Sequence, residues 1–229
     1  MKDKVRIAFI GGGNMAEAII SSIILGGLIS SEKILVSDPS LVRRDLLSEK
    51  YGVAPYSENK KMLVDIGKSS EPTLIVIAIK PQQLNQVIEE LNGGISEEHV
   101  VLSIVAGVKI DTLINSLKHE SVIRVMPNTP AQIGRGMSVW TVSDSVSDLY
   151  VDIAREMLQT LGLEILVDEE KYIDMATALS ASGPAYVFMF LEAMIDAGVY
   201  IGLSREMSSK LATQTILGSI ELVNITGTQ

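Results

Sequence analysis

The sequence predicts an α/β fold, with a parallel sheet in its N-terminal part and an all-helical domain at its C-terminus. Short apolar runs of strand length alternate with segments of helical periodicity between Val5 and Val167. Strands that are apolar throughout must be covered on both faces, and their spacing leaves room for crossover helices, so a doubly wound sheet is expected. After Asp168 the strand-like runs stop and three helical stretches follow. We therefore place the domains at 1–168 and 169–229.

The expected elements alternate as this fold requires. The strands are expected at 5–10, 33–37, 73–79, 99–105, 121–125, 137–142 and 164–167. The helices are expected at 14–25, 41–50, 58–66, 81–91, 147–161, 169–181, 184–201 and 204–225. Turn residues separate them: Gly26 and Gly27 end the first helix, Asp38-Pro39 forms a turn, and Pro81 starts a helix at a position where proline is tolerated.

Composition limits the possible partners. The chain has 19 Lys and Arg against 28 Asp and Glu, a formal charge of −9, so it lacks the basic surface that binds nucleic acids and anionic membranes. It has no cysteine, which excludes disulfides and thiolate metal sites and fits a reducing compartment. We expect a cytoplasmic protein with no metal site, no nucleic-acid partner and no membrane association.

The N-terminal segment is apolar as far as Leu28, as a signal peptide or membrane anchor would be. Charges at Asp3 and Glu17 interrupt it, and the three glycines from Gly11 to Gly13 break it. We therefore expect neither a leader nor an anchor.

A glycine loop directly follows the first expected strand. Gly11, Gly13 and Ala16 form the pattern G-x-G-x-x-A at the start of the first helix. The first glycine permits a tight turn, the second lets a pyrophosphate approach the backbone, and the alanine keeps helix and strand close. Because the helix N-terminus also offers oriented N–H groups, the pattern predicts a Rossmann-type dinucleotide-binding domain.

The end of the second strand bears on the choice of cofactor. Asp38 can bind both ribose hydroxyls of NAD and repel the additional phosphate of NADP. Ser40, Arg43 and Arg44 follow at once and could instead bind that phosphate, although arginines there also fit a solvated helix face. The residues therefore leave both NADPH and NADH open as cofactor.

The loops after the later strands should lie at the same edge of the sheet, where open α/β sheets bind ligands. They contain Lys80-Pro81, Ala106-Gly107, and Asn128-Thr129 between two prolines that stiffen the loop. Neither His99 nor His119 falls at this edge, so no general base for an alcohol substrate is evident. This favours a C=N substrate, which arrives protonated and mainly needs alignment with the nicotinamide.

The expected helix 184–201 is apolar nearly all round and is broken only by Glu192 and Asp196. It is too polar for a membrane span and too apolar for a surface helix. Because a small helical domain is marginal by itself, we expect this helix at a homodimer interface, with higher homo-oligomers left open. Ser182, before it, has the chemistry of a helix cap.

Several segments together resemble pyrroline-5-carboxylate reductase. They read FIGGGNMAEAI, AIKP, VAGV, RVMPNTPAQIGRGM and SASGPAYVFMFLEAMIDAGV, and the resemblance extends over all 229 residues. It implies a Rossmann domain followed by an all-helical dimerisation domain. It also implies NADPH or NADH as hydride donor and 1-pyrroline-5-carboxylate as a substrate that is reduced to L-proline, the last step of proline biosynthesis.

The candidate site residues follow from these loops and from the resemblance, and no catalytic residue is assigned. The substrate-pocket candidates are Asn128, Thr129, Ser180, Ser182 and Tyr186. The cofactor contacts that the resemblance implies are Gly11, Gly12, Gly13, Asn14, Met15, Ala16, Ser37, Asp38, Ser40, Asn59, Ala78, Ile79, Lys80, Pro81, Ile104, Val105 and Ala106. Members of this family continue past the equivalent of Gln229 with a Ser-Pro-Gly-Gly-Thr-type loop that holds the substrate, so the helical domain is expected to be incomplete.

Two other functions stay open from the sequence. A different NAD(P)-dependent imine or β-hydroxyacid reductase would share the cofactor and differ in substrate. A catalytically silent regulatory protein would bind the dinucleotide without oxidising it. Oxidation of NAD(P)H on addition of pyrroline-5-carboxylate would separate a pyrroline-5-carboxylate reductase from the silent protein.

Overall fold

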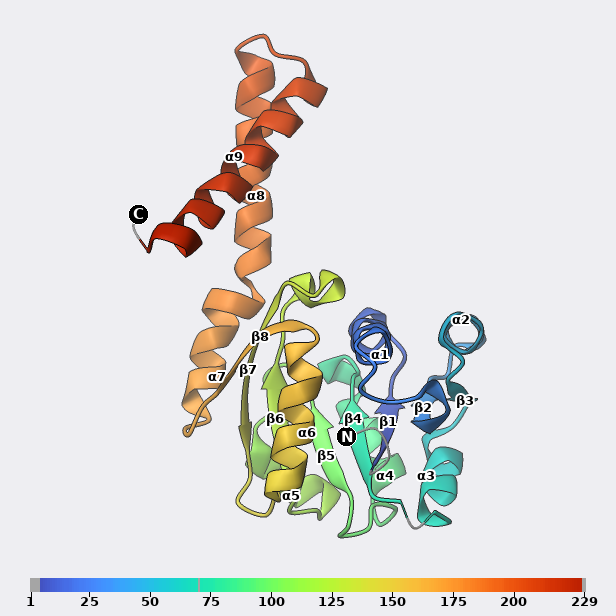
Figure 1. The fold of residues 1–229 in the computed structure, drawn as a ribbon. Helices are drawn as coiled ribbons and strands as arrows, with labels where there is room; N and C mark the ends of the chain where they lie inside the picture. Colours follow the sequence, from blue (N-terminus) through green and yellow to red (C-terminus); the bar gives the residue numbers. More distant parts are fainter. Residues whose placement is uncertain (1–4, 70, 228–229) are drawn as a thin grey trace. The chain divides into compact units, whose positions relative to one another are not determined.

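The computed structural model describes residues 5–69 and 71–227 (Figure 1). Residues 1–4 lie outside the described residues. They include Asp3, whose charge we took as evidence against a leader or an anchor. The strands are β1 (Arg6–Ile10), β2 (Ile34–Ser37), β3 (Ala54–Tyr56), β4 (Thr73–Ile77), β5 (Val100–Ser103), β6 (Val122–Met126), β7 (Gly136–Val142) and β8 (Gly162–Leu166). The helices are α1 (Asn14–Leu25), α2 (Leu41–Tyr51), α3 (Asn59–Gly67), α4 (Leu84–Leu91), α5 (Ile110–Leu117), α6 (Asp148–Gln159), α7 (Lys171–Ala176), α8 (Gly183–Tyr200) and α9 (Arg205–Thr226).

The strands form one sheet in the order β3-β2-β1-β4-β5-β6-β7-β8. The strand order reverses between β1 and β4, so the loops that follow these two strands diverge and leave a crevice at their carboxyl ends. The pairing of β6 with β7 is antiparallel, whereas the other pairings in the described sheet are parallel. The expected parallel sheet is confirmed for those other pairings. Strand β7 departs from it, because a short loop with the 3₁₀ turn Thr129–Ile133, rather than a crossover helix, joins β6 to β7.

Two elements of the structure, β3 and α5, were not predicted from the sequence. Strand β3 has three residues and contains Pro55, which cannot donate a hydrogen bond and is confined to an edge position. Helix α5 buries Ile110, Leu113 and Leu117, a helical spacing that was present in the sequence and was missed. The strand expected at 73–79 ends at Ile77, which leaves the next residues free to form a loop at the crevice.

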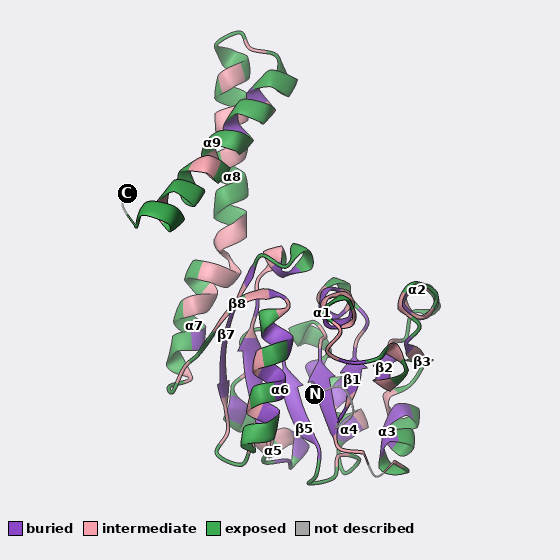
Figure 2. Cartoon of the chain, in the orientation of Figure 1, coloured by how far each residue is buried: buried purple, intermediate pink, exposed green. Residues whose placement is uncertain are grey.

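The sheet is covered on both faces, and the alternation of side chains along each strand divides the core into two clusters (Figure 2). In β1, Ile7 and Phe9 pack with α1, α2 and α6 on one face. Ala8 and Ile10 pack with α3, α4 and α5 on the other. Because β1 is buried on both sides, its carboxyl end, where the glycine loop begins, is held rigidly.

A buried arginine fastens α7 to the sheet. Arg124 on β6 is 2% exposed and donates to Glu170 and Asp174, each at 2.7 Å. Glu170 also accepts the backbone N–H of Ile110 at 2.8 Å. These bonds satisfy the buried guanidinium, as its desolvation requires.

The chain divides into two compact units, Met1–Ala181 and Ser182–Gln229. This division follows contacts and includes α7 in the first unit, whereas the boundary at Asp168 was drawn from the loss of strand pattern and stays a prediction. In the second unit α8 and α9 pack closely, since a Cβ on Gly198 would lie 2.5 Å from Ser208 Oγ. Most of the apolar side chains of α8 are exposed, among them Phe188, Met189 and Phe190. By length and composition alone, the helical stretch Lys171–Tyr200 could also cross a membrane.

Both histidines are buried at the amino ends of the strands. His99 Nδ1 accepts the backbone N–H of Thr73 at 3.2 Å, and His119 Nε2 donates to the carbonyl oxygen of His99 at 3.0 Å. Burial lowers the pKa of both histidines below the ordinary value of 6.5. The folded protein therefore binds fewer protons than the unfolded chain as the pH falls.

We predict that the free energy of unfolding decreases as the pH falls below about 6.5, where unfolded histidines take up protons. Above that pH the stabilisation from the neutral histidines is fully present. Urea unfolding at pH 7.5 and 5.5 measures the loss, and a His99→Gln/His119→Gln variant should lose less stability between these two pH values. An equally large loss in that variant would show that other groups cause it.

Candidate functional site

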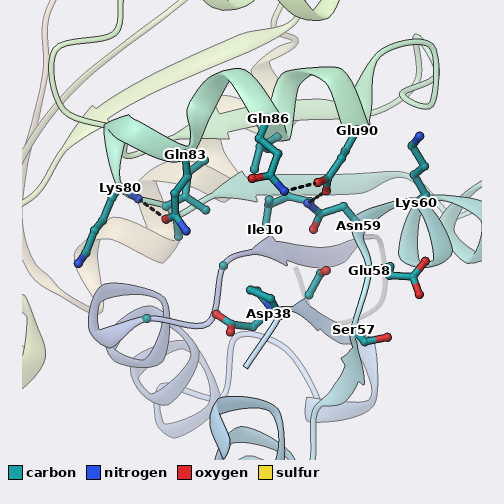
Figure 3. Close-up of a pocket in the computed structure, with 17 residues that line it drawn as sticks. Ile10, Asp38, Ser57, Glu58, Asn59, Lys60, Lys80, Gln83, Gln86 and Glu90 are labelled. Carbon is teal, nitrogen blue, oxygen red and sulfur yellow. Dashed lines mark hydrogen bonds between the residues drawn. The ribbon is translucent and has the colours of Figure 1, made fainter. Parts of the chain in front are cut away.

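A cavity of about 550 Å³ lies at the carboxyl ends of β1, β2 and β4, beside the reversal of strand order (Figure 3). Backbone hydrogen bonds fix its rim: Gly11 N donates to Ser37 O, and Ala78 N donates to Ile10 O, both at 2.8 Å. The residues that line it are Ile10, Gly11, Gly13, Ser37, Asp38, Pro39, Ser57, Glu58, Asn59, Lys60, Ala78, Ile79, Lys80, Gln83, Gln86, Val87 and Glu90.

The glycine loop has the geometry that a pyrophosphate needs. Gly11 has φ +96°, and a Cβ there would lie 2.6 Å from the carbonyl oxygen of Ala78, so only glycine fits. A Cβ on Gly13 would meet no atom within 4 Å, which leaves its backbone open to the cavity. Gly13 is the N-cap of α1 and brings no side-chain cap, so the first N–H groups of the helix can bind an anion.

Asp38 holds the glycine loop as well as lining the cavity. Its Oδ2 accepts the N–H of Gly12 and its Oδ1 accepts the N–H of Ser40, both at 2.8 Å. The sequence indicated a ribose contact for this carboxylate but not its hydrogen bonds to the loop. Because each carboxylate oxygen can accept a second hydrogen bond, binding of ribose hydroxyls is compatible with this structural role.

The two arginines after Asp38 also support the loop rather than line the cavity. Arg43 Nε donates to the carbonyl oxygen of Gly12 at 2.7 Å, and its Nη2 donates to Glu17 at 2.8 Å. Arg44 Nη1 donates to the carbonyl oxygens of Asp38 and Pro39. The interpretation of both as a solvated helix face is therefore wrong, because each guanidinium satisfies backbone carbonyls at the carboxyl edge.

Glu17 completes this support from α1. Burial acts to raise its pKa, but hydrogen bonds from Arg43, Lys50 and Tyr51 outweigh burial and leave the pKa below its ordinary value. A carboxylate that stays ionised keeps the guanidinium of Arg43 against the glycine loop.

The cavity gathers about half of the predicted cofactor contacts. Those that line it are Gly11, Gly13, Ser37, Asp38, Asn59, Ala78, Ile79 and Lys80. Those that do not are Gly12, Asn14, Met15, Ala16, Ser40, Pro81, Ile104, Val105 and Ala106. One wall of the cavity, formed by α4 and the turn before it, was not predicted. Its residues Gln83, Gln86 and Glu90 recur at helical spacing after Lys80, and this pattern could have indicated it.

Among the substrate-pocket candidates, Asn128 and Ser180 lie together. Asn128 Oδ1 accepts the N–H of Met137 at 2.9 Å, and its Nδ2 lies 3.3 Å from the carbonyl oxygen of Ser180. Ser180 belongs to a π-helical turn, Thr177–Ala181, a distortion common at functional sites. Thr129 begins the 3₁₀ turn after β6.

Ser182 and Tyr186 belong to the second unit. Ser182 precedes α8 but has helical backbone angles and makes no side-chain cap hydrogen bond. The capping hypothesis is therefore wrong, because an N-cap needs an extended backbone to turn its hydroxyl toward the helix N–H groups. Within residues 5–69 and 71–227, no group of three or more His, Asp or Glu could hold a metal ion.

Comparison with known proteins gives a consistent result. A family model for pyrroline-5-carboxylate reductase dimerisation matches residues 170–229, and a model for NADP oxidoreductase, coenzyme F420-dependent, matches residues 6–107. The pyrroline-5-carboxylate reductase of Arabidopsis thaliana is 33% identical over 98% of this chain and 79% of its own length.

Solved structures agree with this assignment. The pyrroline-5-carboxylate reductase of Coxiella burnetii has a TM-score of 0.88 and 33% identity, over 99% of this chain and 82% of that one. The pyrroline carboxylate reductase of Plasmodium falciparum with NADP bound has a TM-score of 0.84 and 30% identity, over 98% and 80%. The glycine loop, the cavity beside it and these similarities lead to one conclusion: the chain belongs to the pyrroline-5-carboxylate reductase family.

Proposed function

We propose that this chain reduces 1-pyrroline-5-carboxylate to L-proline with a hydride from NADPH or NADH, the last step of proline biosynthesis. The observation that carries the proposal is the cavity at the strand-order reversal, which the glycine loop and the Ala78–Lys80 segment line. In a chain of this family, such a cavity fits a nicotinamide dinucleotide.

The residues divide the cofactor site into parts. The N–H groups at the start of α1, left open by Gly13, hold the pyrophosphate. Asp38 and Asn59 would hold the adenosine ribose, and the Ala78–Lys80 segment, which also lines the cavity, would hold the nicotinamide half. The nicotinamide, when bound, supplies the hydride.

The protein's part in the reaction is mainly binding and alignment. A cyclic imine is basic enough to arrive protonated, so its carbon is already electrophilic and the chain need not supply a general base. Both histidines lie at the amino ends of β4 and β5, the edge of the sheet opposite the cavity. For the substrate pocket we propose Asn128, Thr129, Ser180, Ser182 and Tyr186, of which Asn128 acts by holding Ser180.

The family model for pyrroline-5-carboxylate reductase dimerisation covers residues 170–229, so the chain forms a homo-oligomer. The family to which it belongs acts on a small molecule. We propose in addition that the oligomer is built from dimers in which α8 packs against a second copy. Its side chains Phe188, Met189 and Phe190 are 62%, 70% and 61% exposed, and water contact with so much apolar surface is unfavourable. We assign the exposed apolar side chains of α8 to this interface rather than to a membrane.

We also propose a domain boundary near Asp168, and we place the protein in the cytoplasm without a nucleic-acid partner.

The reaction itself is the first test. Purified protein should oxidise NADPH or NADH when pyrroline-5-carboxylate is added, and L-proline should appear in equal amount. Omission of the imine is the control. Binding of the reduced cofactor without its oxidation would instead support a silent regulatory protein. Faster oxidation with another imine would show that this other imine is the substrate.

We predict that Gly13→Asp abolishes cofactor binding and leaves the fold intact. The new carboxylate meets the pyrophosphate at close range, and the open space around Gly13 spares the protein a clash. Titration calorimetry should show a Kd for NADPH and NADH raised at least ~100-fold, or about 2.8 kcal/mol. Gly67→Asp, at another open glycine outside the cavity, is the matched control; equal affinities for both variants would refute the assignment.

We predict that Phe190→Asp disrupts the oligomer. A carboxylate without a partner in an apolar interface costs several kcal/mol, so light scattering should detect smaller species and activity should fall. Leu25→Asp, at an 84% exposed position on α1, makes the same kind of change outside α8 and should leave the mass unchanged. A Phe190→Asp protein of unchanged mass and full activity contradicts the interface.

A further inference from the structure

The carboxylate of Glu90 is engaged on both oxygens, although the proposed reaction gives it no task. Glu90 lies on α4 and lines the cavity. Its Oε2 accepts a hydrogen bond from Asn59 Nδ2 at 2.7 Å, and its Oε1 accepts one from Gln86 Nε2 at 2.9 Å. Figure 3 shows the three side chains meeting at the upper wall of the cavity.

These bonds fix the orientation of the Asn59 amide. A flip of the amide would place its oxygen against the carboxylate of Glu90, where two acceptors repel each other. The bond to a charged acceptor is also stronger than a neutral one. Nδ2 therefore stays on Glu90, and Oδ1 lies on the opposite side of the amide as an acceptor for a ligand.

An acceptor at this place distinguishes a hydroxyl from a phosphate. A ribose 2′-hydroxyl can donate to Oδ1, whereas a phosphate on the same oxygen offers only acceptors. The lining residues near Asn59 add the carboxylates of Asp38 and Glu58, with Lys60 as the nearby cation. Arg43 and Arg44, which could have bound a phosphate, do not line the cavity in the described part of the chain.

We propose that Glu90 is a positioning residue that, through Asn59, makes the cavity discriminate against a phosphate on the 2′-oxygen of the adenosine ribose. Glu90 thus acts on the choice between the two nicotinamide cofactors without touching the reacting atoms. The inference rests on the proposed function only in that the adenosine half of the cofactor lies at this end of the cavity.

The test uses ligands without a nicotinamide, so that it is independent of catalysis. Titration calorimetry measures the Kd of the intact protein for ADP-ribose and for its 2′-phosphorylated form. Glu90→Gln keeps the shape of the side chain but replaces one carboxylate oxygen with an NH2 group, so a flipped Asn59 amide is no longer repelled. The ratio of the Kd for the phosphorylated form to that for ADP-ribose should therefore fall about tenfold. Glu89→Gln, an equal change of charge on the next residue of α4 outside the cavity, should shift the ratio less than about twofold.

A second pair of variants tests the route through Asn59. In an Asn59→Ala background, the change from Glu90 to Gln should shift the ratio by less than half as much. A full shift in that background overturns the positioning role, because Glu90 then acts by charge alone. An unchanged ratio in Glu90→Gln, or equal shifts in Glu89→Gln and Glu90→Gln, overturns it too.

The proposed function can fail separately. Wild-type protein that binds both nucleotides with the expected dependence on Glu90, but oxidises no cofactor with pyrroline-5-carboxylate, would leave this inference standing. Wild-type protein that binds neither nucleotide overturns both.

Discussion

The burial of β1 on both faces is the constraint on which the rest of the molecule depends. A strand with Ile7 and Phe9 on one side and Ala8 and Ile10 on the other needs helices above and below it. Crossover helices meet that need only if the neighbouring strands run parallel, so their carboxyl ends collect at one edge. The cavity is a consequence of this arrangement, since it opens where the strand order reverses beside β1.

A second layer of interactions turns that edge into a binding site. The glycine loop has few side chains of its own, so neighbours from other elements hold it: Asp38 binds the N–H of Gly12 and Arg43 binds its carbonyl oxygen. Glu17, kept ionised by three donors, holds Arg43 in turn. A loop fixed from both sides can present its open N–H groups without reorganisation when an anion binds.

The proposed reaction depends on the alignment of substrate and cofactor rather than on a histidine in the cavity. Neither histidine reaches the cavity, because both are buried at the other edge of the sheet, where they bind backbone groups. Reduction of a protonated imine needs no histidine, since the substrate arrives with its own proton and the hydride comes from the cofactor. The protein must mainly hold the substrate and the cofactor in the right orientation. The polar contacts around the cavity, including the hydrogen bond from Asn59 to Glu90, fix the side chains that do this.

The sequence by itself determined the alternation of strands and helices, the glycine loop after β1 and the apolar character of α8, because each depends on residues close together in the chain. It gave no sign of β3, which is too short to show a period, and it predicted β7 as a strand without indicating that this strand runs antiparallel to β6. Only the tertiary structure decided that Asp38 and Arg43 hold the loop and that Glu90 meets Asn59 from 31 residues away. Hydrogen bonds between residues so far apart leave no periodic signal in the sequence. Only the folded structure shows which of these residues are in contact.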